Sequence, residues 1–414
     1  MNYDAIVVGS GAAGLISAIT IAQKDENKKV LLIEQLPRLA SKLKATGGGR
    51  CNLSNTLPNE QFISSFGRNS RFITNAINSF NHQDLIGFFK SIGVETHIPD
   101  GFRIFPTTHK SDTIIEALSN ELIKLNIQIE LNTKLSDILI SNNEVVGIKT
   151  QNNIYNCKNL ILATGGLGYP KLGATGEAFD IVKNLGHTIT NLYPAMMPLY
   201  VKEDWVASCT ADTISKVTIK VNLPKVKKLK KLKAIGDIIF TKKGIRGPVV
   251  LDFAREITPF LDEIPEVPIL INLTKNMNEN DIIIHIKKEV MSNPNKNILE
   301  IISSILPLSV SEALCKSIGI DPNSSYKNID GIKKDKLHKI LAWTPLNVIG
   351  HDGFNNAMIT RGGISLKEID PNTMQSKIID GLYFVGEIVD IDGPCGGYNL
   401  QWAFSSGYLA GKLL

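Results

Sequence analysis

Gly9-Ser10-Gly11-Ala12-Ala13-Gly14 is the stretch of this chain that decides its fold. It follows an apolar run at residues 5–8 that is typical of a buried strand, and it opens a helical pattern over residues 15–19. A second apolar run, Val30–Ile33, ends in Glu34. This order predicts a βαβ unit that carries the G-x-G-x-x-G fingerprint of dinucleotide-binding folds in its proper context.

Each glycine of the fingerprint has a physical reason. Gly9 makes the tight turn, Gly11 lets the backbone approach a pyrophosphate, and Gly14 lets helix and strand pack closely. The phosphates would sit at the helix N-terminus, and Glu34 would accept hydrogen bonds from a ribose. A tight turn that binds no ligand is disfavoured, because the preceding strand, the following helix and the acid that ends the second strand all match a dinucleotide-binding unit. The cofactor-binding residues predicted here are Gly9, Gly11, Ala12, Ala13, Gly14, Glu34 and Gln35.

Length and composition bound the class of protein. A chain of 414 residues exceeds the size at which single cores stop growing, so we expect two or three domains. With 43% hydrophobic and 21% charged residues the composition is that of a globular protein, and the net charge of +5 requires no polyanionic partner. The five cysteines are scattered and form no C-x-x-C pair, which argues against a disulfide framework, a redox dithiol or a metal site.

Targeting signals are not apparent. The first predicted strand begins within a few residues of Met1, which leaves no room for a signal peptide. No uncharged apolar stretch reaches the roughly 18–20 residues that span a bilayer. We therefore expect a cytoplasmic protein without a membrane partner, and the sequence leaves its oligomeric state open.

The order of patterns predicts a split domain. Residues 1–193 alternate strand and helix signals, and residues 345–414 return to them after an interruption. Between these halves, residues 194–275 alternate like antiparallel strands and residues 276–344 are mostly helical. The fold class that follows is α/β: a doubly wound cofactor-binding domain, split in sequence, with a two-part insert.

Three further glycine-rich segments follow predicted strands. Residues 46–52 come after a short basic stretch containing Lys42, and Arg50 offers a fork of donors for phosphate. Residues 163–166 end a strand, where ligands bind in doubly wound sheets, so we predict contacts from Ala163, Thr164 and Gly165. Residues 385–401 open the last helix, whose N-terminus favours negative charge. Plain surface loops are the alternative in each case.

These motifs in combination resemble one family. T-G-G-G-R-C-N at 46–52, F-P-T-T at 105–108, A-T-G-G at 163–166, G-L-Y-F-V-G-E at 381–387 and G-G-Y-N-L-Q at 396–401 are similar to the BaiN-like flavoproteins, also described as aminoacetone-oxidase-family FAD-binding enzymes. The resemblance covers the chain from about Tyr3 to its C-terminus. It implies FAD, a glutathione-reductase-like FAD domain, and an insert made of a β-barrel and a helical subdomain.

The resemblance also implies site residues. It places Lys42, Gly48, Gly49, Arg50, Cys51, Asn52, Leu135, Gly386, Glu387, Gly397, Asn399, Leu400 and Gln401 along the FAD, in addition to the fingerprint residues. This chain departs from the family pattern at Ala40-Ser41, where a Gly-Arg pair is usual. It departs again at Arg361, where a small residue usually precedes the two glycines.

Catalytic residues are less well specified. Arg103, in a segment similar to the family's G-R-x-F-P, could bind a carboxylate or a hydride donor's phosphate, and an ion pair within the protein is an equal alternative. Tyr398 could donate a proton or simply pack. No second G-x-G-x-x-G follows a strand, so NADH or NADPH would have to dock transiently near the flavin.

The lysine run at residues 225–233 has two readings. It could bind nucleic acid through its positive charges, although it contains no interleaved aromatic residues on which bases could stack. We favour a solvated hairpin edge whose lysines prevent pairing with another edge, and we expect no nucleic-acid partner.

Three functions follow in order. The leading hypothesis is an FAD-dependent oxidoreductase that uses NAD(P)H to reduce a small organic acceptor, such as an activated C=C bond as in unsaturated steroid acids. The second is a flavin oxidase of a small amine such as aminoacetone, which would release hydrogen peroxide. The third, supported by the lysine run alone, is a flavoprotein that acts on RNA.

Overall fold

The computed structural model describes residues 2–223, 229 and 231–414. These residues form two compact units: Met1–Tyr193 together with Ile359–Leu414, and Pro194–Met358. Each unit has its own hydrophobic core. Lys225, Lys227, Lys228 and Lys230 of the lysine run lie outside the described residues.

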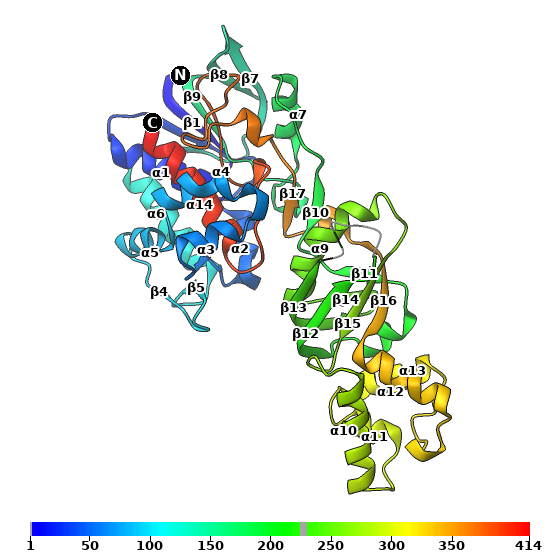
Figure 1. Cartoon of the computed structure of the whole chain (residues 1–414). Coiled ribbons are helices and arrows are strands. Elements are labelled where there is room, and N and C mark those ends of the chain that lie inside the picture. The colour runs from blue at the N-terminus through cyan, green and yellow to red at the C-terminus, as the bar shows by residue number, and fades with distance from the viewer. Residues whose placement is uncertain (1, 224–228, 230) are drawn as a thin grey trace. The chain divides into compact units, whose positions relative to one another are not determined.

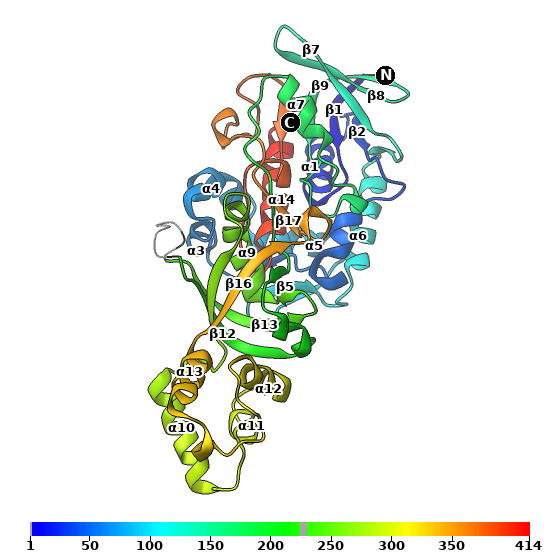
Figure 2. The ribbon, with the colours of Figure 1, turned by 90° about the vertical axis from the view of Figure 1, so that its right-hand side faces the viewer.

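The first unit is built on a mostly parallel sheet. Its parallel strands are β1 (Asn2–Val8), β2 (Val30–Ile33), β6 (Gln128–Glu130), β9 (Ile154–Leu162) and β18 (Leu382–Phe384). The antiparallel strands β7 (Leu135–Ser141) and β8 (Glu144–Thr150) extend it beyond β9, giving the order β6-β2-β1-β9-β8-β7. Figure 2 shows the β7–β8 hairpin reaching out from this sheet.

Two helices from opposite ends of the chain pack side by side against this sheet (Figure 1). They are α1 (Ala12–Lys24) and α14 (Tyr398–Leu413). A side chain at Gly407 would place a Cβ 2.3 Å from the Ala13 carbonyl oxygen, so glycine permits this approach. The close packing joins the two sequence halves of the unit at the start of α1.

Shorter elements complete the first unit. They are α2 (Ser41–Ala45), β3 (Ser54–Asn55), α3 (Asn59–Ser64), α4 (Ser70–Ser79), α5 (His82–Ser91), β4 (Thr96–His97), β5 (Arg103–Pro106), α6 (Ser111–Lys124), α7 (Glu177–Asn184) and β17 (Ile359–Arg361). The strands β3, β5 and β4 form a small antiparallel sheet.

The second unit is a closed antiparallel barrel accompanied by helices (Figure 1). Its strands follow the order β11 (Leu199–Val201), β14 (Gly244–Arg246), β13 (Lys233–Thr241), β12 (Thr213–Val221), β15 (Val267–Asn272) and β16 (Thr344–His351). The short strand β10 (Tyr193–Ala195) precedes it. The helices are α9 (Pro248–Leu261), α10 (Glu279–Ser292), α11 (Ile298–Ile302), α12 (Leu308–Ser317) and α13 (Gly331–Ala342). Helices α10 to α13 are grouped at one end of the barrel, while α9 packs against the barrel strands, chiefly β13 (Figure 1).

The predicted fold class, a split doubly wound α/β domain with a β-barrel and helical insert, is confirmed. One boundary differs: residues 345–358 belong to the second unit, because β16 pairs with β11 and β15 and closes the barrel. Residues 194–275 also contain a helix, α9, which runs from Pro248 to Leu261 between strands of the barrel. Among the described residues, no helix has the length and apolarity needed to cross a membrane.

The strands that flank the lysine run pair with each other as a hairpin, and most of the run itself lies outside the described residues, so its role as an edge guard stays a prediction. Strand β12 pairs with β13 and β15, and β13 pairs with β12 and β14. Both strands are members of the closed barrel, but β14 pairs with β13 only at Ile239–Thr241.

Candidate functional site

The fingerprint glycines differ in what surrounds them. A Cβ on Gly9, where φ is +98°, would lie 2.6 Å from the Ala163 carbonyl oxygen, and a Cβ on Gly14 would lie 1.9 Å from the Gly9 carbonyl oxygen. A Cβ on Gly11 would meet no described atom within 4 Å. The protein's own packing thus requires glycine at positions 9 and 14, whereas Gly11 leaves a space at the start of α1 that a ligand can enter.

Glu34 is held at the carboxyl end of β2 by the fingerprint loop. The Ser10 amide and hydroxyl donate to its Oε2 at 2.9 and 2.6 Å, and the Leu36 amide donates to Oε1 at 2.9 Å. A carboxylate can accept about four hydrogen bonds, so capacity remains for a ribose hydroxyl. The sequence reading missed Ser10, although it lies inside the fingerprint.

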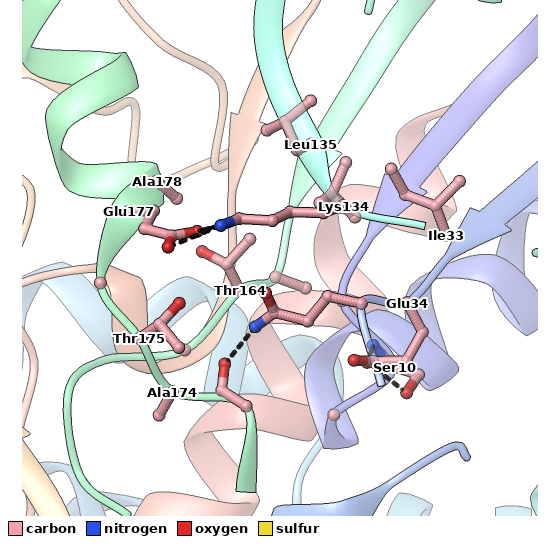
Figure 3. Close-up of a pocket in the computed structure, with 18 of the residues that line it drawn as sticks. Ser10, Ile33, Glu34, Lys134, Leu135, Thr164, Ala174, Thr175, Glu177 and Ala178 are labelled. Atoms are coloured by element: carbon pink, nitrogen blue, oxygen red, sulfur yellow. Dashed lines mark hydrogen bonds and ion pairs between the residues drawn. The ribbon is translucent and has the colours of Figure 1, made fainter. Parts of the chain in front are cut away.

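A pocket opens at the carboxyl ends of β1, β2 and β9, where ligands bind in doubly wound sheets (Figure 3). It receives nine of the residues predicted from the sequence: Gly9, Gly11, Glu34, Gln35, Lys42, Leu135, Ala163, Thr164 and Gly165. It is also lined by Thr133, Lys134 and residues 172–178, which carry no motif that would have identified them.

The pocket contains a polar group without a partner in the protein. The buried Thr164 Oγ1 finds no hydrogen-bond partner among the described residues, and Figure 3 places Thr164 inside the pocket. The Ser41 Oγ of α2, next to the pocket residue Lys42 in sequence, is likewise buried and has no partner among the described residues. Buried polar atoms are normally hydrogen-bonded, so these hydroxyls fit a polar ligand. Together with the space at Gly11, they fit the FAD that the motifs imply.

Two contacts draw residues 172–178 over the pocket (Figure 3). The Gln35 side-chain amide donates to the Gly173 carbonyl oxygen at 2.6 Å, and the Lys134 ammonium lies 2.6 Å from the Glu177 carboxylate. Gln35 therefore shapes the pocket through a protein contact.

An ion pair joins the two sequence halves of the first unit. The Lys42 ammonium lies 2.6 Å from Glu387 Oε2, and both side chains are largely buried. The Thr360 amide donates to Glu387 Oε1 at 2.8 Å. Two residues predicted to bind the cofactor thus meet each other across 345 positions of sequence.

Three amide side chains shape the other glycine loops. In the orientation that satisfies its neighbours, Asn52 donates to the Ser54 carbonyl and accepts from the Gly397 amide at 3.0 Å. Asn55 donates to the Gly396 carbonyl at 3.0 Å. Asn399 accepts from the Gly393 amide at 2.8 Å and donates back to its carbonyl. These bonds tie residues 46–55 to the loop that opens α14.

The remaining residues of these loops occupy contrasting environments. Gly48 and Gly49 have positive φ and open space around them. Cys51 is fully buried, and burial raises the pKa of its thiol to about 12, so the thiol stays protonated. The Gly386 amide donates to Ser406 Oγ, and Gly386 lies against Ala13 of α1. Ala12, the first residue of α1, is buried.

Gln401 does not line the pocket. It is buried, and its side chain donates to the Phe80 carbonyl and to Ser405 Oγ, each at 2.9 Å. Its neighbour Leu400 is half-buried against the core of the first unit. Gln401 thus joins α14 to the end of α4.

Arg103 is already paired. Its Nε lies 2.5 Å from Asp100 Oδ2, and its guanidinium carbon lies 5.7 Å from the centre of the Phe105 ring, which Arg50 also approaches at 5.6 Å. Slight burial opposes ionisation of Asp100, but hydrogen bonds from the backbone and side chain of Arg103 outweigh it and lower the pKa of Asp100 to about 2. The ion-pair alternative is therefore present in the structure.

Tyr398 sits in an aromatic cluster. Its ring stacks on Phe62 with centroids 4.9 Å apart and meets the edge of Phe66 at 6.0 Å. Its hydroxyl lies 3.5 Å from Ser65 Oγ, which is a long contact. These contacts supply the packing role considered for this residue.

Comparisons with known proteins agree with this geometry. Residues 3–413 match the model of the HI0933-like protein Rossmann domain. The 3-dehydro-bile acid delta(4,6)-reductase of Clostridium scindens is 28% identical over 98% of this chain and 97% of its own length. The ribosomal RNA dihydrouridine synthase of Haemophilus influenzae is 30% identical over 97% of this chain and 96% of its own length.

A solved structure shares the fold. The 3-ketosteroid delta1-dehydrogenase of Sterolibacterium denitrificans aligns over 100% of this chain and 99% of its own with a TM-score of 0.54 and 11% identity. The matched family model spans nearly the whole chain. The chain belongs to the HI0933-like family of FAD-dependent Rossmann oxidoreductases.

Proposed function

We propose that this enzyme reduces a C=C bond conjugated to a carbonyl group, with NADH or NADPH as the electron source. The observation that carries the proposal is the chemistry shared by its relatives. One is named for reduction at the 4,6 positions of a 3-dehydro-bile acid and the other for making dihydrouridine in ribosomal RNA. In both products a carbon–carbon double bond conjugated to a carbonyl has been saturated.

The residues that would hold FAD follow from the pocket. Gly11 and the start of α1 would receive the pyrophosphate, Glu34 the ribose, and Thr164 a further polar group of the adenosine half. Bound there, FAD would supply the hydride for the reaction. Lys42 and Glu387 would fix the relative position of the loops along the cofactor.

Saturation of the acceptor needs a hydride at the carbon β to the carbonyl and a proton at the α carbon. The protein's part is to orient the acceptor and exclude water. Burial raises the pKa of the Cys51 thiol to about 12, so this thiol is protonated but a weak acid. Arg103 and Tyr398 stay candidates for contact with the acceptor.

The acceptor can be a free small molecule or a uracil ring within RNA. The dihydrouridine synthase relative supports the second class, so we do not retain the expectation that nucleic acid is uninvolved. An amine oxidase, the other alternative from the sequence, has no support among these relatives.

The test begins with the purified enzyme under anaerobic conditions. We expect NADH or NADPH to bleach the oxidised flavin band near ~450 nm. Adding a steroid enone, or unmodified ribosomal RNA, should then restore the band and yield a saturated product detectable by mass spectrometry. Failure of both acceptors to reoxidise the reduced enzyme would refute the proposal, and peroxide release with an amine would favour the oxidase.

A further inference from the structure

The net positive charge of this chain comes from one unit. The whole sequence has 45 Lys and Arg residues against 40 Asp and Glu residues. Residues 194–358 hold 23 of the basic residues and 18 of the acidic ones, so the first unit is balanced at 22 of each. The entire net charge of +5 therefore belongs to the inserted unit.

Within the insert the charge gathers on the β12–β13–β14 segment, residues 213–246. This segment contains eleven basic residues and one acidic residue, Asp237. Seven of the basic residues are described by the structure: Lys216, Lys220, Lys231, Lys233, Lys242, Lys243 and Arg246. We call these seven the basic face.

The basic face is not neutralised by the protein. All of its residues are exposed except Lys220, which is half-buried. None forms an ion pair with another described residue, whereas Lys202, Lys296 and Lys316 of the same unit each pair with a glutamate. Such a surface carries a strong positive potential and attracts polyanions.

The arrangement costs stability, and the barrel does not explain it. Lys220 lies directly opposite Lys233 in the β12–β13 register, and like charges in that position repel. Pairing of the two strands does not require a lysine at either position, since the ladder is made by backbone groups. A local violation of this kind is typical of functional surfaces.

The fold supplies the aromatic rings that the lysine run lacks. Lys220 Nζ lies 3.7 Å from the centre of the Trp343 ring, and Lys243 Nζ lies 5.0 Å from that of Tyr200. Both rings are half-exposed. Lysines that track a phosphate backbone beside aromatic rings that stack on bases are the elements of single-stranded nucleic-acid binding.

We propose that the basic face binds the phosphate backbone of RNA and that Trp343 and Tyr200 lie where bases can stack. This surface deepens the proposed function, since it would present an RNA-borne acceptor, but binding itself requires no reduction. RNA is preferred over other polyanions because one relative acts on ribosomal RNA by name and because the rings favour bases.

The test measures binding of the full-length holoenzyme to a fluorescein-labelled, uridine-rich, single-stranded RNA by anisotropy over a range of salt concentrations. The variant K231Q/K233Q/K242Q/K243Q removes four charges of the basic face. The matched control K29Q/K90Q/K158Q/K183Q removes four exposed, unpaired lysines of the first unit. Thermal melting verifies that both variants fold.

We expect the basic-face variant to bind at least about tenfold more weakly at 0.1 M salt. The slope of log Kd against log salt should fall by about 0.7 for each lysine that contacts phosphate. The control should match the wild type. Equal weakening in both variants, or wild-type binding too weak to detect at this salt, would overturn the proposal.

Competition distinguishes the partner. Heparin or phosphatidylglycerol vesicles that bind as tightly as RNA through the same lysines would show a general polyanion surface and overturn the assignment to RNA. Substitution W343A should weaken RNA binding without changing the salt slope. Flavin reduction by NAD(P)H is measured on the same samples, so loss of RNA binding and failure of the reductase chemistry are separate results.

Discussion

Gly11 and Gly14 belong to one fingerprint, but the protein's own packing requires glycine at position 14, whereas the proposed ligand requires it at position 11. A methyl group at Gly14 would meet the Gly9 carbonyl at 1.9 Å, so G14A should lower the free energy of unfolding by about 2 kcal/mol or more. A methyl group at Gly11 meets no described atom, so G11A should leave the apoprotein as stable as the wild type and weaken FAD binding about tenfold or more.

Apoprotein melting and FAD titration by flavin fluorescence separate these two effects. The pair of variants serves as its own control, because both add one methyl group within the same turn. Full FAD affinity in G11A would contradict the placement of the pyrophosphate at the start of α1.

His187 gives the first unit a pH-dependent stability. Its ring is buried against Phe384, with Nε2 3.1 Å from Ser376 Oγ and Nδ1 3.4 Å from Glu368 Oε2. Burial lowers the pKa of His187 below its ordinary value of 6.5, although Glu368 opposes this. The unfolded chain therefore takes up a proton first as pH falls, and the folded state loses stability below about pH 6.5.

Substitution H187Q should flatten this dependence. Urea unfolding at about pH 7.5 and about pH 5.5 measures it, and the wild type should lose more stability between these values than H187Q does. The exposed His109 provides the control, since H109Q should follow the wild type. Identical losses in wild type and H187Q would contradict a neutral, buried His187.

At the scale of elements, the β12–β13 pair sets like charges against each other. Because Lys233 faces Lys220, K233Q should raise the free energy of unfolding by roughly 0.2–1 kcal/mol. In the β7–β8 pair Lys149 faces Asp137, so K149Q should lower it by a similar amount. Chemical denaturation of K233Q and K149Q measures whether their free energies of unfolding change in opposite directions. If both variants are destabilised, charge repulsion between Lys220 and Lys233 does not determine the effect of K233Q.

The local sequence pattern was enough to predict some helices and strands but not others. Strands β1, β2 and β9 carry short continuous apolar runs and helix α1 follows with a helical pattern, and the structure contains all four. Strands β3 and β4 have two residues each, too few for any period. Barrel closure depends on β16 pairing with strands that precede it by more than seventy positions, which no window of local sequence records.

The candidate site divides in the same way. Its glycines were predictable from the sequence, because a local turn or a close approach of the backbone requires glycine at each of these positions. The Lys42–Glu387 ion pair and the contacts of Gln35 and Lys134 with residues 172–178 were not, because they depend on tertiary placement of exposed or half-exposed groups. Gln401 was assigned to the cofactor from its motif, and that assignment stays a prediction: its amide nitrogen donates to the Phe80 carbonyl and to Ser405 Oγ, while its buried Oε1 has no partner among the described residues.

At the scale of the whole molecule, cofactor pocket and basic face lie in different units. The pocket is lined entirely by residues of the first unit, and the basic face belongs entirely to the second. The charges separate as well, since the first unit is balanced and the second carries the excess. If the basic face binds RNA as proposed, the cofactor pocket and the RNA-binding surface belong to different units.

The second unit should therefore fold by itself. Residues 194–358 are continuous in sequence, include all six strands of the closed barrel, and bury a core to which the first unit contributes no residue. A fragment of this length lies within the usual size of an independent domain. Expressed alone, it should unfold cooperatively by circular dichroism and retain RNA binding.

The complementary deletion should separate the activities. With residues 194–358 replaced by a short Gly/Ser linker, the first unit keeps its sheet, its core and its pocket, and should retain FAD with a melting transition raised by added cofactor. It should lose RNA binding. If instead the deletion releases FAD while the fragment 194–358 stays folded, the cofactor must depend on the insert, and the pocket of the first unit alone cannot account for its retention.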